Sequence, residues 1–243
     1  MATFVLVPGA SHTAWCWHKL VPLLEEAGHS VKAIDLPGTG ENRSIEPRDA
    51  TLAVWARYVA SEVSSAEDPV LLAGHSRGGY VISEAAELVP DAVAGLIYVS
   101  GVIPLPGEDL LTAAGLEREA MPADEHGFVM TAPPEIVNQF FYNRCTPEDR
   151  VEANGRLFAE PFRPLSDVSG VSSERWGGVR RAYIECADDH TFPLEAQRRM
   201  QATAPCDPVI TLDSDHSPFL CVPDALAEAM LEIASRFVAG RVV

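Results

Sequence analysis

The chain has 243 residues, 47% of them apolar, and a formal charge of −17. We expect a single domain over residues 1–243, because this length and apolar content fit one sizeable core. The negative charge argues against nucleic-acid or membrane partners, since both need a positive protein surface to offset phosphate charge. With no apolar run near the roughly 18 residues of a membrane span and no export signal at the N-terminus, the sequence predicts a soluble, cytoplasmic protein.

Strands and helices are predicted to alternate through the first hundred residues. Short apolar runs rich in β-branched residues are typical of buried parallel strands, and apolar residues at helical spacing separate them. The predicted strands cover residues 3–7, 31–34, 70–73 and 93–99. The predicted helices cover residues 20–27, residues 51–64 and a segment that ends near Pro90.

The alternation lapses between about residues 104 and 178, where proline is frequent and only short helices fit. We expect this segment to be a cap insertion after the fourth strand, within the same domain. The alternation then resumes with a strand, a helix, a strand and a helix, at residues 182–186, 194–203, 208–212 and 224–238. Strands and helices in this order predict a mainly parallel sheet covered by helices on both faces.

The cysteines and histidines do not form a metal-binding pattern. Five cysteines are scattered along the chain without a CxxC pair, which is typical of reduced, buried thiols. His12, Cys16 and His18 lie close together, but no second cluster of matching spacing accompanies them. We therefore predict no metal site.

The strongest local signal for catalysis is the sequence Gly-His-Ser-Arg-Gly at residues 74–78. It follows a predicted strand and opens a predicted helix, which is the context of a nucleophile elbow. Small residues at Gly74 and Gly78 let strand and helix approach closely around Ser76. The alternative is a glycine-rich turn with an incidental serine, and the partners required downstream decide between the two.

A serine hydroxyl needs a histidine to accept its proton and a carboxylate to orient that histidine. His216 lies in a polar loop between the last predicted strand and the last predicted helix, which is where the base of such a site belongs. Asp188 and Asp189 follow the strand at 182–186, at the carboxyl edge of the sheet. The residues alone do not choose between these two neighbours.

The oxyanion of an acyl-transfer reaction needs two backbone N–H donors. One is expected from Arg77, which follows the nucleophile. The other is expected from the loop after the first strand, where Ala10 follows Pro8 and Gly9. Only the backbone acts at either position.

Nearly the whole chain resembles one family of α/β hydrolases, which includes plant methylesterases, salicylic-acid-binding esterases, hydroxynitrile lyases and bacterial relatives. The segments that carry the resemblance are FVLVPGA (4–10), AWCW (14–17), LLEEAGH (23–29), GHSRGG (74–79), YIECADD (183–189), FYN (141–143), QR (197–198) and DH (215–216). The resemblance implies the α/β-hydrolase fold. It also implies Asp189 as the acid, because the family's aspartate lies four residues before the proline that is Pro193 here, and it places the oxyanion amides on Ala10 and Arg77.

Three departures from the family pattern bear on the activity. The similar lyases have threonine where this chain has Gly9, and a lysine after the catalytic histidine where this chain has Ser217. The absence of that lysine argues against cyanohydrin cleavage. Plant members have histidine in place of Pro8, whereas bacterial relatives resemble this chain in having proline.

Aromatic residues are concentrated in the predicted cap and beside the oxyanion loop, and clusters of this kind can line an apolar pocket. The candidates for substrate binding are Trp15, Trp17, Phe128, Phe140, Phe141 and Tyr142. The alternative for each residue is that it holds the cap on the core.

The sequence therefore predicts a serine carboxylesterase that acts on small esters, methyl or aryl esters among them, through Ser76, His216 and Asp189 and without a cofactor. A lyase or other non-hydrolytic enzyme on the same fold is the first alternative, and a catalytically silent ligand-binding protein is the second. A homodimer is expected because it is common among similar proteins.

Overall fold

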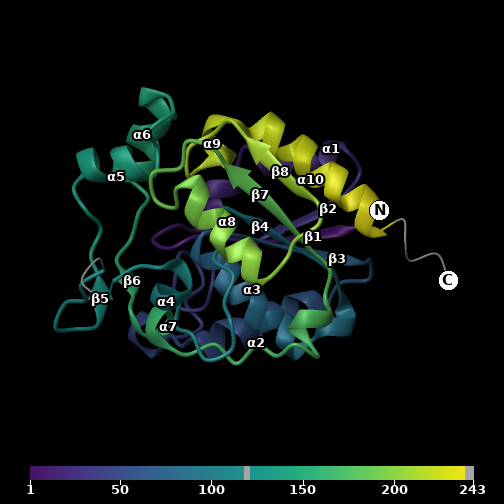
Figure 1. The fold of residues 1–243 in the computed structure, drawn as a ribbon. Helices are drawn as coiled ribbons and strands as arrows, with labels where there is room; N and C mark the ends of the chain where they lie inside the picture. Colours follow the sequence, from purple (N-terminus) through teal and green to yellow (C-terminus); the bar gives the residue numbers. More distant parts are fainter. Residues whose placement is uncertain (118–120, 239–243) are drawn as a thin grey trace.

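Six parallel strands form the central sheet, in the spatial order β2-β1-β3-β4-β7-β8 (Figure 1). The computed structural model describes residues 1–117 and 121–238. The strands are β1 (Thr3–Val7), β2 (Ser30–Ala33), β3 (Val70–His75), β4 (Val93–Val99), β7 (Arg181–Cys186) and β8 (Val209–Leu212). The strand order reverses between β1 and β3, and ligands of open parallel sheets bind in the crevice beyond the carboxyl ends at such a reversal.

Helices cover both faces of this sheet, as the alternation of elements predicts. On one face, α2 (Leu52–Ser64), α3 (Arg77–Leu88) and α8 (Leu194–Thr203) contribute to one buried cluster. On the other face, α1 (Leu20–Glu26), α9 (Pro218–Cys221) and α10 (Pro223–Val238) contribute to a second. No helix within residues 1–117 and 121–238 is long and apolar enough to cross a membrane.

Local sequence accounts for where the main elements begin and end. Helix α2 begins after Thr51, whose hydroxyl accepts the Val54 N–H at 3.1 Å as an N-cap. Helix α1 is followed by Gly28 at φ 86°, a left-handed conformation that glycine adopts without steric cost. Most predicted boundaries agree with the structure to within one residue, but β3 continues two residues further, through Gly74 and His75.

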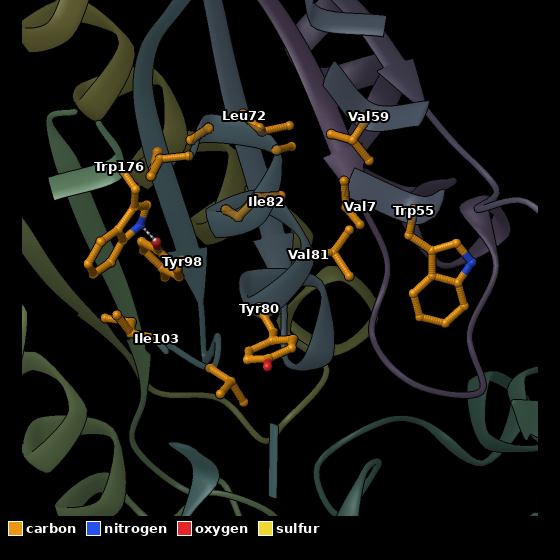
Figure 2. Close-up of a cluster of buried hydrophobic side chains, with 14 of the residues drawn as sticks. Val7, Trp55, Val59, Leu72, Tyr80, Val81, Ile82, Tyr98, Ile103 and Trp176 are labelled. Carbon is orange, nitrogen blue, oxygen red and sulfur yellow. Dashed lines mark hydrogen bonds between the residues drawn. The ribbon is translucent and has the colours of Figure 1, made fainter. Parts of the chain in front are cut away.

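The cluster under α2 and α3 contains a polar contact that fixes one wall of the core. Figure 2 shows Trp176 reaching Tyr98, whose hydroxyl accepts the indole N–H at 3.0 Å. The same hydroxyl lies 2.7 Å from the Ser83 hydroxyl of α3. Both aromatic side chains are buried, so these bonds satisfy polar groups that would otherwise be costly in an apolar interior.

The insertion between β4 and β7 lies partly beyond the carboxyl edge of the sheet and partly against the helices of one face. Its elements are α4 (Leu110–Ala114), β5 (Phe128–Val129), α5 (Pro134–Phe140), α6 (Pro147–Asn154), β6 (Glu160–Pro161), α7 (Arg163–Ser166) and the 3-10 helix η5 (Trp176–Gly178). Helices α5 and α6 and the antiparallel pair β5–β6 extend beyond the carboxyl edge of the sheet (Figure 1). Helix α7 instead packs on α2, and η5 packs on α3.

Candidate active site

A cavity of about 410 Å³ lies beyond the carboxyl ends of β1 and β3, between the sheet and the insertion. The sheet side contributes Ala10, Ser11, His12, His75, Ser76, Arg77, Thr191, Phe192 and His216. The insertion contributes mainly apolar side chains, among them Leu110, Leu116, Met121, Val129, Ile136, Val137, Phe140, Phe141 and Leu157. The cavity is therefore mostly apolar, with a small polar floor.

Ser76 occupies a strained turn between β3 and α3. Its backbone has φ 50° and ψ −122°, a conformation that is costly for any residue except glycine. The turn is possible because its neighbours lack side chains. A Cβ on Gly74 would lie 2.5 Å from the Gly78 backbone, and a Cβ on Gly78 would lie 2.5 Å from the Val7 carbonyl oxygen. Ser76 is 7% exposed and lines the cavity.

His216 lines the same cavity and bonds to a buried carboxylate. Its Nδ1 lies 2.7 Å from Oδ2 of Asp189. The second oxygen of Asp189 accepts the Thr191 and Phe192 N–H groups at 2.7 and 2.8 Å. A carboxylate that only accepts hydrogen bonds keeps the proton of the imidazole on Nδ1, so Nε2 is left with its lone pair.

Asp188 faces a different environment from its neighbour. Its side chain is 48% exposed and accepts a hydrogen bond from the Asn143 amide at 3.1 Å. Of the two aspartates that the residues alone leave open, Asp189 is the one whose carboxylate bonds to His216.

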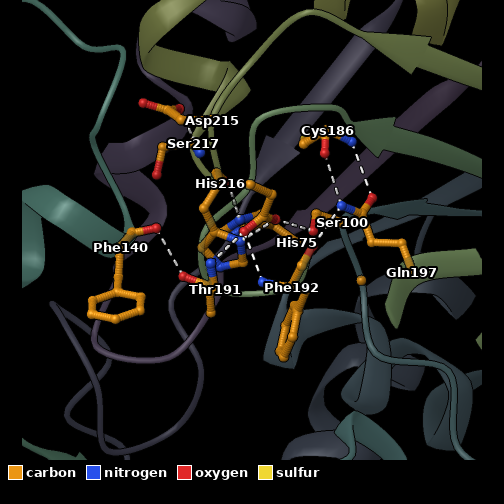
Figure 3. A network of polar contacts seen from close by, with 12 residues as sticks. His75, Ser100, Phe140, Cys186, Thr191, Phe192, Gln197, Asp215, His216 and Ser217 are labelled. Atoms are coloured by element: carbon orange, nitrogen blue, oxygen red, sulfur yellow. Dashed lines mark hydrogen bonds and ion pairs between the residues drawn. The ribbon is translucent and has the colours of Figure 1, made fainter. Parts of the chain in front are cut away.

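Two residues without an assigned role in the sequence analysis support this pair. The Ser100 hydroxyl, directly after β4, donates to Asp189 Oδ2 at 2.5 Å. His75 lies at the centre of Figure 3 with its Nε2 2.7 Å from the His216 carbonyl oxygen, where it donates. Burial lowers the pKa of His75 well below its ordinary value, so the ring is neutral. Ser100 is at the carboxyl end of a strand that neighbours β3, which is the one sequence signal that could have pointed to it.

The loop that carries Asp189 is fixed by α8. The Gln197 side chain is fully buried, and its Oε1 accepts the Cys186 N–H at 3.0 Å. Its Nε2 donates to the carbonyl oxygens of Cys186 and Phe192, at 2.9 and 2.7 Å. Figure 3 shows these bonds, and it also shows the Thr191 hydroxyl donating to the Phe140 carbonyl oxygen of the insertion. The carboxylate therefore sits on a loop with little freedom to move.

The six aromatic residues predicted to bind substrate divide into two groups. Phe140 and Phe141 line the cavity. The other four, Trp15, Trp17, Phe128 and Tyr142, do not. Trp17 is buried against Phe219, with ring centroids 5.1 Å apart, and Trp15 and Phe128 line a separate surface hollow. Trp17 and Tyr142 are fully buried and hold the loop and the insertion on the core, the alternative weighed for each, whereas Trp15 and Phe128 line the separate hollow.

Tyr142 takes part in a bond that joins the insertion to the loop after β1. Its hydroxyl lies 2.7 Å from His12 Nε2, and His12 Nδ1 lies 2.7 Å from the Ala10 carbonyl oxygen. Because that carbonyl can only accept, Nδ1 carries the proton and the tyrosine hydroxyl donates to Nε2. Burial lowers the pKa of His12 to about 4, so a neutral imidazole makes both bonds.

One group within residues 1–117 and 121–238 has the spacing of metal ligands. The ligand atoms of Cys145, Asp215 and Cys221 lie within 4.8 Å of one another. However, the Asp215 carboxylate already accepts the Arg144 and Ser217 N–H groups, and both thiols donate to it at 3.4 and 3.1 Å. A hydrogen bond with Cys221 and burial raise the pKa of the Cys145 thiol, which opposes the thiolate that a metal needs. These contacts anchor the loop beside His216.

Comparison with known proteins agrees with this architecture. Residues 4–229 match the model of the alpha/beta hydrolase family. The chain is 32% identical to Methylesterase 7 of Arabidopsis thaliana, over 96% of each protein. It is 33% identical to Salicylic acid-binding protein 2 of Nicotiana tabacum, over 96% of this chain and 97% of that protein.

Solved structures give the same result. The crystal structure of polyneuridine aldehyde esterase superposes with a TM-score of 0.84 at 29% identity, and covers 96% of this chain and 99% of that one. A pyrethroid hydrolase superposes with a TM-score of 0.83, also at 29% identity, over 97% of this chain and 98% of that one. The expectation of the fold and of its relatives is confirmed, and the chain belongs to the alpha/beta hydrolase family, alongside plant methylesterases.

Proposed function

We propose that the protein is a serine carboxylesterase that hydrolyses small carboxylic esters, methyl or aryl esters among them. One observation carries the proposal: Ser76, on a strained turn, shares a cavity with His216, whose Nδ1 is bonded to the buried Asp189. A serine, a histidine and a carboxylate in this order are the groups that acyl transfer needs. The relatives named as esterases add support.

The proposed reaction has two steps. Ser76 Oγ attacks the ester carbonyl while His216 Nε2 accepts its proton, and the resulting imidazolium is stabilised by Asp189. His216 then protonates the departing alcohol as the bond to it breaks, which leaves an acyl group on Ser76. In the second step His216 takes a proton from water, the hydroxide adds to the acyl carbon, and the acid leaves as Ser76 regains its proton. The backbone N–H groups of Ala10 and Arg77 receive the oxyanion in both steps.

The cavity favours a small, largely apolar ester. Its volume of about 410 Å³ lies within the usual range for small-molecule pockets. The Phe141 and Phe192 rings each lie 5.5 Å from the His216 ring, centroid to centroid, and Phe140 and aliphatic side chains of the insertion also line the cavity. No step of this mechanism requires a metal or an organic cofactor. Cytoplasmic location and a homodimer stay predictions from the sequence.

The test compares the purified protein with Ser76→Ala on p-nitrophenyl esters of short acids. Loss of the nucleophile is expected to lower kcat by several orders of magnitude. Thr131→Ala removes another hydroxyl from the cavity lining and serves as a matched control that keeps most of the activity. A thermal unfolding midpoint near that of the wild type shows that each variant is folded.

A fluorophosphonate, which phosphonylates serine nucleophiles with loss of fluoride, gives a second measurement. Intact mass should show one adduct on the wild type and on Thr131→Ala, and none on Ser76→Ala. If the wild type neither turns over esters nor forms the adduct, the esterase proposal fails. Release of cyanide from mandelonitrile would then favour the lyase alternative, and its absence would favour a ligand-binding protein.

A further inference from the structure

A buried ion pair connects the nucleophile elbow with the insertion. Arg77 lies at the first turn of α3 and Glu160 in β6, and their side chains are only 2% and 1% exposed. Arg77 Nε lies 3.0 Å from Glu160 Oε1, and the guanidinium packs over the Trp55 ring, 4.6 Å from its centroid. Removing two charges from water costs more than such a pair commonly returns in stability. The pair therefore calls for an explanation beyond stability.

Each partner also binds the backbone of the loop after β1. Arg77 Nη2 donates to the Gly9 carbonyl oxygen at 2.9 Å. Glu160 Oε2 accepts the Ser11 N–H at 2.7 Å. Ala10 lies between these two positions, so the ion pair holds the peptide group on each side of it.

The bond to Gly9, whose oxygen also accepts the His12 N–H at 3.3 Å, constrains where the Ala10 N–H points. The carbonyl of Gly9 and the N–H of Ala10 belong to the same planar trans peptide and point in opposite directions. A guanidinium that fixes the oxygen therefore also fixes the N–H. Because the donor is charged, the bond is stronger than a neutral one and polarises the peptide, which makes its N–H a better donor.

We infer that the Arg77 side chain and Glu160 are positioning residues that aim the Ala10 N–H at the oxyanion. This rests on the proposed function, in which that amide receives the oxyanion. Arg77 then acts twice, once through its own backbone N–H and once through its guanidinium. Glu160 makes the insertion part of the oxyanion hole, since the arginine loses its counter-charge without β6.

Three variants separate positioning from stability. Arg77→Met and Glu160→Gln each leave one buried charge unpaired, so both are expected to lower the unfolding midpoint. The double variant has no buried charge, and its midpoint should recover toward the wild-type value. If the pair positions the amide, kcat of the double variant stays on the order of 10- to 100-fold below that of the wild type. This loss is smaller than the about 10²- to 10³-fold loss that follows complete removal of an oxyanion donor. KM changes little, since the ground-state ester does not need the hole.

Inhibition by a trifluoromethyl ketone measures directly how well the oxyanion hole stabilises an oxyanion. Addition of Ser76 to its carbonyl gives a tetrahedral oxyanion, whereas the unfluorinated ketone binds without forming that adduct. The ratio of the two inhibition constants should fall in the three variants in line with kcat. Asp149→Asn is the matched control, because it breaks the ion pair between Lys19 and α6, at 2.6 Å, without touching residues 9–11. Its ratio should equal that of the wild type.

Failure of this inference and failure of the proposed function give different experimental results. If the double variant regains both stability and kcat, and the inhibitor ratio does not change, the pair is structural and the inference is overturned while the esterase proposal stands. If the wild type itself shows no turnover and forms no ketone adduct, the proposed function fails instead.

Discussion

Among single residues, two adjacent aspartates differ entirely in what surrounds them. Asp189 accepts hydrogen bonds from His216, Ser100 and two backbone N–H groups. Asp188 lies half in solvent. An aspartate's environment, and not its position in the chain, determines whether it can orient an imidazole.

Asp189→Asn should therefore inactivate the protein without unfolding it. The asparagine amide fills the same space, but it offers His216 a donor as well as an acceptor and no longer keeps the proton on Nδ1. A change of this kind costs about 10⁴-fold in kcat in a serine triad. The measurement is kcat on a p-nitrophenyl ester, beside Asp188→Asn as the control with the same chemistry one residue away. Equal loss in both variants would contradict the assignment.

The residues of the candidate site differ in how far the sequence points to them. Ser76 and His216 stand in local patterns, so a single chain was enough to propose them. Ser100, Glu160 and His75 are joined to the site by contacts with residues far away in sequence, which no local pattern records. Their roles become visible only once the strands are placed side by side.

At the scale of elements, the close approach of α3 to β1 sets the geometry of the elbow. The two elements meet at Gly78, which has no room for a side chain because its neighbours are the Val7 and Pro8 carbonyl oxygens. Backbone atoms of a central strand cannot move aside as a flexible side chain can. The loop that begins at Pro8 carries Ala10, so any displacement here also reaches the proposed oxyanion hole.

Gly78→Ala is expected to destabilise the protein and to lower its activity. The new Cβ would lie 2.5 Å from the Val7 oxygen. Overpacking of a core typically costs about 1–3 kcal/mol, and a clash with backbone belongs at the upper end of that range. Urea unfolding measures the loss. Gly178→Ala is the control, because a Cβ there meets nothing within 4 Å. Equal stability of the two variants would show that the elbow can relax.

Periodicity predicted the elements of the sheet well and those of the insertion poorly. Buried parallel strands are continuous apolar runs, so their ends are marked clearly in the sequence. The two-residue strands β5 and β6 have no such signal, since they exist only because Phe128 and Pro161 are brought together by the rest of the fold. The helix α9 outside the insertion is not predicted either, because its four residues are too few to show a helical period.

For the whole molecule, the main question is what holds the insertion over the cavity. The bond from Tyr142 through His12 to the Ala10 carbonyl is one such connection, and it needs a neutral imidazole. Burial lowers the pKa of His12 from its ordinary 6.5 to about 4, with the charges of His216 and Arg77 acting in the same direction. Protonation would place a positive charge on a buried side chain and would remove the acceptor for Tyr142.

The stability that depends on neutral His12 is therefore fully present above pH 6.5 and is lost as pH falls toward 4. At about 1.4 kcal/mol per pKa unit, the full shift corresponds to about 3 kcal/mol. Urea unfolding at a series of pH values measures the loss. His12→Gln keeps a donor and an acceptor but does not titrate, so its stability should fall less over that range, while the neutral His75 still contributes to both proteins. Parallel curves for the two proteins would mean that His12 keeps its ordinary pKa and does not connect the insertion to the loop.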